Sequence, residues 1–316
     1  MKQEGGRPAR TVRRTGPAVR GDVAPHRTQE QGMAEAAMGG NLEHARETGD
    51  GSDVSTISAA APAEVGLRFE VDGEIATVTL DRPDKRNAQT FATWSALARI
   101  GETLPEQVRV VVVRGEGPSF SAGIDLRMFT PEGVPGQGSF ASAAALGDTE
   151  FEQRIAEAQK GFLWLRRPEI VSIAAVQGHA IGAGFQLALA CDLRVVADDV
   201  KFCMKEPALG LVPDLTGTKP LADIVGVPRA IEMCLTARTV GAAEAVRLGL
   251  AEIAVPASEL AQAVQDLAAA LLATDRAAAA ATKRLLQAAP GRTLEEQAAA
   301  ERAEQVTRIR ALFASN

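Results

Sequence analysis

Residues 170–197 read Ile-Val-Ser-Ile-Ala-Ala-Val-Gln-Gly-His-Ala-Ile-Gly-Ala-Gly-Phe-Gln-Leu-Ala-Leu-Ala-Cys-Asp-Leu-Arg-Val-Val-Ala. The apolar run at 170–176 is typical of a strand that is buried on both faces. Glycines at 178–184 predict a turn, and the residues from 185 to 191 follow a helical period. A further strand is predicted at 193–197. Strands that alternate with helices in this way predict an α/β fold.

The same alternation extends in both directions from this stretch. Toward the N-terminus, two runs with period two flank Asp72-Gly73 and predict a β-hairpin. Thr90 or a neighbour is expected to cap a helix that runs to about residue 103. We also expect a strand at 108–113, helices at 155–165, 257–273, 276–288 and 293–313, and a glycine-rich lid at 130–148. These patterns divide the chain into a segment 1–64, a core 65–256 and a C-terminal helical region 257–316.

Composition narrows the class of protein further. The chain has 316 residues and a net charge of −6, which argues against a nucleic-acid-binding surface. We find no apolar run long enough for a membrane-spanning helix, and residues 1–64 are too polar to form a core and are predicted to be disordered. The 3 cysteines lack CxxC spacing and favour a reducing, cytoplasmic location. The histidines are too scattered to predict a metal site.

Two glycine-rich turns are candidates for the functional site. One spans residues 121–126 and the other 182–186, and each leads into a predicted helix. Unpaired N–H groups at a helix start favour a phosphate or a developing oxyanion. Neither turn matches a nucleotide-binding motif. Each alone is more often a simple turn, but two facing one site would form an oxyanion hole.

Two carboxylates lie in apolar surroundings further along the chain. Glu206 follows a predicted strand, and Asp214 lies within Leu211-Val-Pro-Asp-Leu-Thr-Gly217. Burial would raise the pKa of either group and suit it to proton transfer near neutral pH. The structural alternatives are that Asp214 caps the next helix and that Glu206 pairs with an arginine.

Six segments in order resemble the enoyl-CoA hydratase/isomerase, or crotonase, family. They are Asp81–Ala88, Phe120–Leu126, Ala175–Ala188, Cys191–Arg194, Leu235–Ala245 and Gly249–Ala251. The resemblance implies a crotonase-like spiral of ββα repeats with a C-terminal helical oligomerisation region that forms homotrimers or homohexamers. It also implies an acyl-CoA thioester substrate and no cofactor beyond the coenzyme A that the substrate carries.

The resemblance assigns roles to individual residues. The N–H groups of Ile124 and Ala183 would form the oxyanion hole. Residues that would bind coenzyme A are Arg86, Ala88, Ala122 and Arg127, although each arginine could also be an ordinary surface residue.

The resemblance also identifies Glu206, Asp214 and Gln186 as the candidate catalytic residues. Family hydratases hold water with two glutamates, and Gln186 stands where the first would be. Dienoyl-CoA isomerases of the family have an aspartate that matches Asp214, but they usually have another aspartate where Gln186 stands. The pattern therefore favours a double-bond isomerase of unsaturated acyl-CoA, with an enoyl-CoA hydratase that uses Glu206 and a non-catalytic acyl-CoA-binding protein as alternatives.

Overall fold

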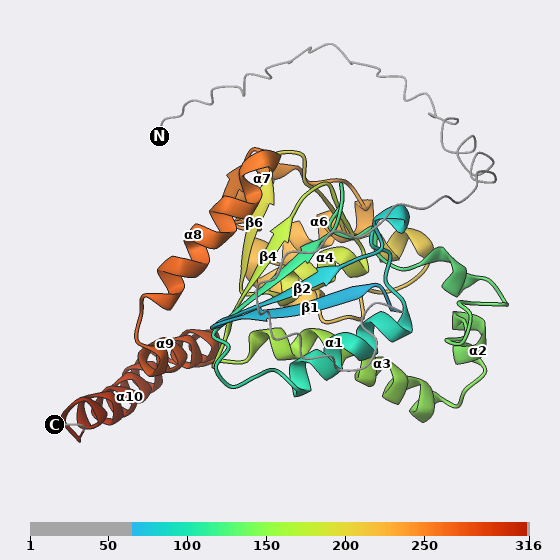
Figure 1. Cartoon of the computed structure of the whole chain (residues 1–316). Coiled ribbons are helices and arrows are strands. Elements are labelled where there is room, and N and C mark those ends of the chain that lie inside the picture. Colours follow the sequence, from blue (N-terminus) through green and yellow to red (C-terminus); the bar gives the residue numbers. More distant parts are fainter. Residues whose placement is uncertain (1–64, 315–316) are drawn as a thin grey trace, which may run out of the picture. The chain divides into compact units, whose positions relative to one another are not determined.

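The structure is a computed structural model, and it describes residues 65–314. Their main sheet, of which Figure 1 labels β1, β2, β4 and β6, has the strand order β1-β2-β3-β4-β6-β8, and a smaller sheet pairs β5 with β7. Only β1 and β2 are antiparallel in the main sheet, as expected of a hairpin that leads into parallel strands. The strands are β1 (Leu67–Asp72), β2 (Ile75–Leu80), β3 (Val110–Gly115), β4 (Val171–Val176), β5 (His179–Ile181), β6 (Leu193–Ala197), β7 (Lys201–Cys203) and β8 (Ile253–Val255).

Helices and short 3-10 turns connect these strands. The α-helices are α1 (Phe91–Glu102), α2 (Phe140–Ala144), α3 (Asp148–Leu163), α4 (Ala183–Ala190), α5 (Thr218–Val225), α6 (Val227–Thr236), α7 (Ala242–Leu248), α8 (Leu260–Leu272), α9 (Arg276–Ala288) and α10 (Leu294–Ala314). The 3-10 turns are η2 (Pro83–Lys85), η3 (Leu126–Phe129), η4 (Trp164–Arg166), η5 (Glu206–Leu209), η6 (Ala257–Glu259) and η7 (Ala289–Gly291).

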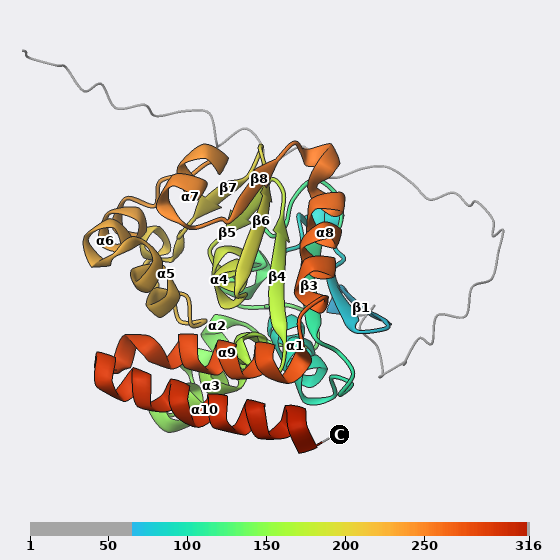
Figure 2. The ribbon, with the colours of Figure 1, turned by 90° about the vertical axis from the view of Figure 1, so that its left-hand side faces the viewer.

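Alternate residues of the central strands pack into two separate hydrophobic layers. Val111, Val113 and Ala174 face the layer that contains α1, α3 and α4. Val110 and Ile173 face the opposite layer, where α8 covers the sheet (Figure 2). The strands are apolar on both faces because both faces are covered, which is why they read as unbroken apolar runs.

The middle of the chain repeats one local pattern. Each repeat has a long strand in the main sheet, a short extended segment in the second layer and then a helical turn. The short segments are β5, β7 and the extended residue Ser121, which forms a parallel bridge with Ala180. The expected crotonase-like α/β fold is therefore present, with its C-terminal helices.

Most of the elements predicted from the sequence are confirmed. Thr90 caps α1 through a side-chain oxygen that accepts from the N–H of Thr93. The helix expected at 155–165 instead begins at Asp148. The expected lid at 130–148 contains α2, and Phe140 of α2 lines a cavity.

Helices α9 and α10 form a pair at the C-terminal end (Figure 2). Lys283 of α9 ties the pair to the core, because its Nζ donates to Asp192 Oδ2 at 2.6 Å and to the carbonyl oxygen of Ile170 at 2.7 Å. Segment 1–64 lies outside the described residues. No helix between residues 65 and 314 is long and apolar enough to cross a membrane.

Candidate active site

The small sheet brings the two glycine-rich turns side by side. The N–H of Ser121 donates to the carbonyl oxygen of His179 at 2.8 Å, and the N–H of Ile181 donates to that of Ser121 at 3.0 Å. Parallel segments end at the same edge of a sheet. The residues that follow Ser121 and Ile181 are therefore neighbours, as the oxyanion-hole hypothesis requires.

Glycine is necessary where the two turns touch. Gly123 has φ +92°, and a Cβ at this position would lie 2.6 Å from the carbonyl oxygen of Ile181 and 3.7 Å from the nitrogen of Ala183. Gly182 has φ +51°, and a Cβ there would lie 3.1 Å from Oε1 of Glu206. A side chain at Gly123 would push the two turns apart, and one at Gly182 would press on the Glu206 carboxyl group, while both positions also have a positive φ that favours glycine.

The N–H groups of Ile124 and Ala183 are free to bind a ligand. The bridge between Gln89 and Ile124 uses the N–H groups of Gln89 and Asp125 but leaves that of Ile124 unused. Ala183 is the first residue of α4, where the helix cannot supply an acceptor. Among the described residues, neither N–H group has a hydrogen-bond partner. Both residues thus satisfy the requirement of an oxyanion hole for unsatisfied donors.

Glu206 lies at the third of these turns, after β7. Its side chain is buried, and Oε1 accepts from Nε2 of Gln186 at 2.6 Å. Oε2 is buried without a partner among residues 65–314. Burial raises the pKa of the Glu206 carboxyl, and the hydrogen bond from Gln186 partly opposes this shift. The carboxyl can therefore exchange a proton nearer to neutral pH than an ordinary glutamate.

Asp214 and Glu206 open onto the same cavity. The volume of this cavity is about 210 Å³, and Ile124 also contributes to its wall. Burial raises the pKa of the Asp214 carboxyl as well. Asp214 does not cap the next helix, because the residue at the start of α5 is Gly217. The structure thus brings the two candidate carboxyl groups and one candidate oxyanion donor to a single cavity.

Gln186 is hydrogen-bonded within the protein at both ends of its amide. Its Oε1 accepts from the N–H of Leu215 at 2.9 Å and from that of Gly217 at 3.2 Å, while Nε2 donates to Glu206. The side chain is fully buried in α4 and is not among the residues that line the cavity. Gln186, one of the three catalytic candidates from the resemblance, therefore holds Glu206 and the turn at 215–217 in position.

The four residues expected at the coenzyme A end lie close together in the chain's fold. Arg86 is exposed, and its carbonyl oxygen accepts from the N–H of Ala122 at 2.8 Å. The carbonyl oxygen of Ala88 accepts from Nη1 of Arg82 at 2.7 Å. Arg127 is half-exposed and its guanidinium forms an ion pair with Asp125 at 2.8 Å. The guanidinium of Arg86, in contrast, forms no hydrogen bond or ion pair with another described residue.

Asp125 and Arg154 are notable residues that the sequence did not single out. Asp125 accepts from Arg127 and from Arg82, and these hydrogen bonds hold the pKa of its carboxyl far below the usual range. Arg154 of α3 lines the cavity among Phe91, Trp94 and Phe140. No local pattern distinguishes Arg154 from the other charged residues of its helix.

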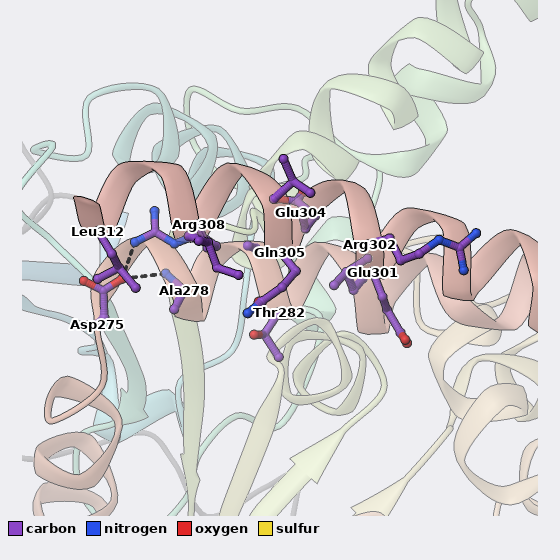
Figure 3. A pocket seen from close by; sticks show the side chains of 13 residues that line it. Asp275, Ala278, Thr282, Glu301, Arg302, Glu304, Gln305, Arg308 and Leu312 are labelled. Carbon is purple, nitrogen blue, oxygen red and sulfur yellow. Dashed lines mark hydrogen bonds and ion pairs between the residues drawn. The ribbon is translucent and has the colours of Figure 1, made fainter. Parts of the chain in front are cut away.

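A larger hollow lies between α9 and α10, away from these groups (Figure 3). Its volume is about 810 Å³, and it is wide open to solvent. Leu285, Val306, Ile309 and Leu312 give it an apolar wall, and Arg308 pairs with Asp275 at one end. It contains none of the candidate catalytic residues, so the smaller cavity is the candidate active site.

Free backbone N–H groups beside buried carboxyl groups are typical of enzymes that stabilise a developing negative charge while a proton moves. Comparison with known proteins identifies the class. The chain belongs to the enoyl-CoA hydratase/isomerase family, whose model matches residues 70–311. It is therefore an enzyme of the acyl-CoA-processing crotonase group.

Named relatives and solved structures agree with this assignment. Carnitinyl-CoA dehydratase of Escherichia coli K12 is 35% identical over 233 residues, which are 73% of this chain and 83% of the relative. A Thermobifida fusca YX protein, provisionally named enoyl-CoA hydratase, superposes with a TM-score of 0.78 at 56% identity, covering 80% of this chain and 96% of the other. A second Thermobifida fusca YX structure with the same protein name, in complex with acetoacetyl-CoA, superposes with a TM-score of 0.75 at 57% identity. The match covers 79% of this chain and 96% of that one.

Proposed function

We propose that the protein is a double-bond isomerase of unsaturated acyl-CoA thioesters, acting on 3-enoyl or 3,5-dienoyl chains. The observation that carries this proposal is the shared cavity of Glu206 and Asp214. Gln186 occupies the position of the first hydratase glutamate, and both its amide oxygen and its amide nitrogen are hydrogen-bonded within the protein. Acid–base groups are thus available at two points along an acyl chain, without a second glutamate to hold water.

The proposed reaction moves one proton along the chain. The thioester oxygen accepts from the N–H groups of Ile124 and Ala183, which lowers the pKa of the carbon next to the carbonyl. For a 3-enoyl chain, one carboxylate removes a proton from C2 and produces a dienolate. The second carboxyl group donates a proton to C4, and the double bond moves from C3–C4 to C2–C3. The turnover leaves the first group protonated and the second ionised, and proton exchange with solvent or between the two groups restores the starting state.

The raised pKa values of Glu206 and Asp214 suit these two proton transfers. The reaction requires one group ionised and the other protonated at the same time. Burial favours the neutral form of both groups, so a singly protonated pair is more populated near neutral pH than for two ordinary carboxylates.

Hydration or dehydration is the second candidate, favoured by the names of the relatives. In that case Glu206 would activate water alone through its unpartnered Oε2. Gln186→Glu should then accelerate hydration, because it restores the second carboxylate. An acyl-CoA-binding protein without catalysis is the remaining alternative, and complexes of similar structures with CoA and acetoacetyl-CoA support the ligand class.

Mass spectrometry after incubation in heavy water separates these candidates. The panel contains 2-enoyl-, 3-enoyl- and 3,5-dienoyl-CoA. We expect deuterium without added water, from the 3-enoyl or the 3,5-dienoyl substrate. Added water would favour hydration, and binding without any reaction would favour the binding protein.

Variants of the two carboxyl groups test their roles. We expect Glu206→Gln and Asp214→Asn each to reduce isomerisation by at least about 100-fold, the low end of the effect of a general acid or base. Glu157→Gln removes an exposed carboxylate of α3 and serves as the control. Full turnover in both cavity variants would refute the proposal.

A further inference from the structure

The cavity wall contains one cation, and its surroundings are mainly apolar. Arg154 projects from α3, and its guanidinium lies 4.3 Å from the centroid of the Phe91 ring. Nη2 donates to the carbonyl oxygen of Gln137 at 3.1 Å. Within residues 65–314, no carboxylate forms an ion pair with Arg154. A guanidinium remains charged at all relevant pH values and retains further N–H donors here.

The two carboxyl groups of the cavity do not neutralise this charge. Neither Glu206 nor Asp214 forms an ion pair with Arg154, and burial, not this guanidinium, dominates the raised pKa of both carboxyl groups. Aspartates and glutamates elsewhere on α3 are also not counter-ions, because Glu157 pairs with Lys160 and no other acid of this helix forms a bridge. The cation is therefore available to a ligand.

Arg154 lines the same cavity as Ile124 and Glu206, but its interactions are with other residues. Its polar and aromatic contacts are with Phe91 at the start of α1 and with Gln137 before α2. None is with Ile124, Ala183 or Glu206, which mark the thioester end of the proposed site. With the thioester oxygen at the N–H groups of Ile124 and Ala183, we infer that a more distant part of the acyl chain meets the guanidinium.

We propose that Arg154 selects acyl-CoA substrates whose chain ends in a carboxylate. A carboxylate can accept two parallel hydrogen bonds from a guanidinium, and such charge-assisted bonds are strong in apolar surroundings. The substrate class is the mono-CoA thioester of an unsaturated dicarboxylic acid. This proposal deepens the proposed function, because it places the acyl chain in the same cavity.

A simpler role for Arg154 is to hold the 137–140 segment against α1. The stack on Phe91 and the bond to Gln137 would suffice for that role. A purely structural arginine would affect charged and uncharged chains equally, whereas a selecting arginine would affect their ratio. The ratio of two affinities is therefore the informative measurement.

Calorimetric titration with glutaryl-CoA and pentanoyl-CoA provides this ratio. The two chains have the same number of carbons, and one ends in a carboxylate where the other ends in a methyl group. Both are saturated, so their binding does not depend on double-bond chemistry. We expect glutaryl-CoA to bind about 10- to 100-fold more tightly, as a charge-assisted hydrogen bond in a partly buried site gives.

Substitutions at Arg154 should change this preference. In Arg154→Gln the ratio should fall toward one, and Arg154→Lys should keep part of it because the charge remains without the two-pronged geometry. Lys160→Gln removes a positive charge from an exposed position of the same helix and should preserve the ratio. Equal affinities in the unmodified protein, or an equal loss for both ligands in Arg154→Gln, would overturn the proposal.

The outcome is separable from that of the proposed isomerisation. A preference for glutaryl-CoA in a protein that isomerises no tested chain would support Arg154 and refute the isomerase. Isomerisation of uncharged chains with equal affinity for both thioesters would support the isomerase and refute the role of Arg154.

Discussion

Replacement of Gln186 by glutamate should make the stability of the protein strongly dependent on pH. In the native protein the amide donates to Glu206 at 2.6 Å and accepts from two backbone N–H groups. Gln186→Glu keeps an acceptor for those N–H groups but places a second carboxyl group against Glu206. Burial and the neighbouring like charge both raise the pKa of such a pair in the folded state.

The sign of the effect follows from proton binding. When the pKa of a carboxyl group is higher in the folded state, the folded protein binds more protons than the unfolded chain above the ordinary carboxyl pKa. The stability that the neutral form contributes is present at low pH and is lost as the pH rises toward the raised pKa. The native protein already loses stability in this way through Glu206 and Asp214, whose pKa values are raised.

The variant should lose additional stability over the same window. One additional proton changes the unfolding free energy by about 1.4 kcal/mol per pH unit. Between about pH 5 and pH 8 the extra loss of unfolding free energy is therefore at most about 4 kcal/mol. It is about 1.4 kcal/mol if folding raises the pKa of the added carboxyl group by only about one unit. Near pH 5 the protonated carboxyl can donate to Glu206 as the amide does, so the difference there should be small.

Urea unfolding at several pH values measures this difference. The matched control combines Gln186→Glu with Glu206→Gln, which exchanges the two groups and restores one carboxyl beside one amide. Its pH dependence should return to that of the unmodified protein. Parallel curves for the single variant and the unmodified protein would contradict the assigned contact, as would a double variant as steep as the single one.

Three further substitutions test other parts of the structure. Gly123→Ala should lower the unfolding free energy by about 2–4 kcal/mol and strongly reduce turnover, because its Cβ would lie 2.6 Å from the carbonyl oxygen of Ile181 at φ +92°; a fully active, stable variant would contradict this. Lys283→Met should cost about 3 kcal/mol in urea unfolding by leaving Asp192 without its cation, and an unchanged midpoint would show that the contact is unimportant. Thr216→Gly should raise the unfolding free energy by about 0.5–1 kcal/mol, and with it the melting temperature, because Thr216 has φ +70°. A lower melting temperature would indicate that the threonine is not strained.

The sequence was sufficient for features that arise from local patterns. The hairpin around Asp72-Gly73, the buried strand β4 and the cap at Thr90 depend on residues within a few positions of one another. The start of α3 was placed too late, although acidic residues at Asp148 and Glu150 are typical of a first helical turn. The polar character of that turn concealed its helical period.

The contacts that define the site could not be predicted in the same way. Gln186 binds backbone groups of residues 215 and 217, and no pattern in the sequence links positions so far apart. The position of Arg154 in the cavity depends on how α3 packs against α1. The family resemblance gave the catalytic candidates but not these partners. The expected homotrimer or homohexamer stays a prediction, which light scattering after size-exclusion chromatography can test.

The repeated strand–segment–turn pattern places two kinds of group at the site: main-chain N–H groups, which do not depend on residue type, and side chains, which do. Ser121, Ala180 and Phe202 pair in one register of the second layer, so the spacing of the turns that follow them is set by main-chain hydrogen bonds. The first two turns offer N–H groups that any amino acid except proline would supply. Substitutions at Gln186, Glu206 and Asp214 could therefore alter the proposed reaction while leaving the proposed main-chain site for a thioester oxygen in place.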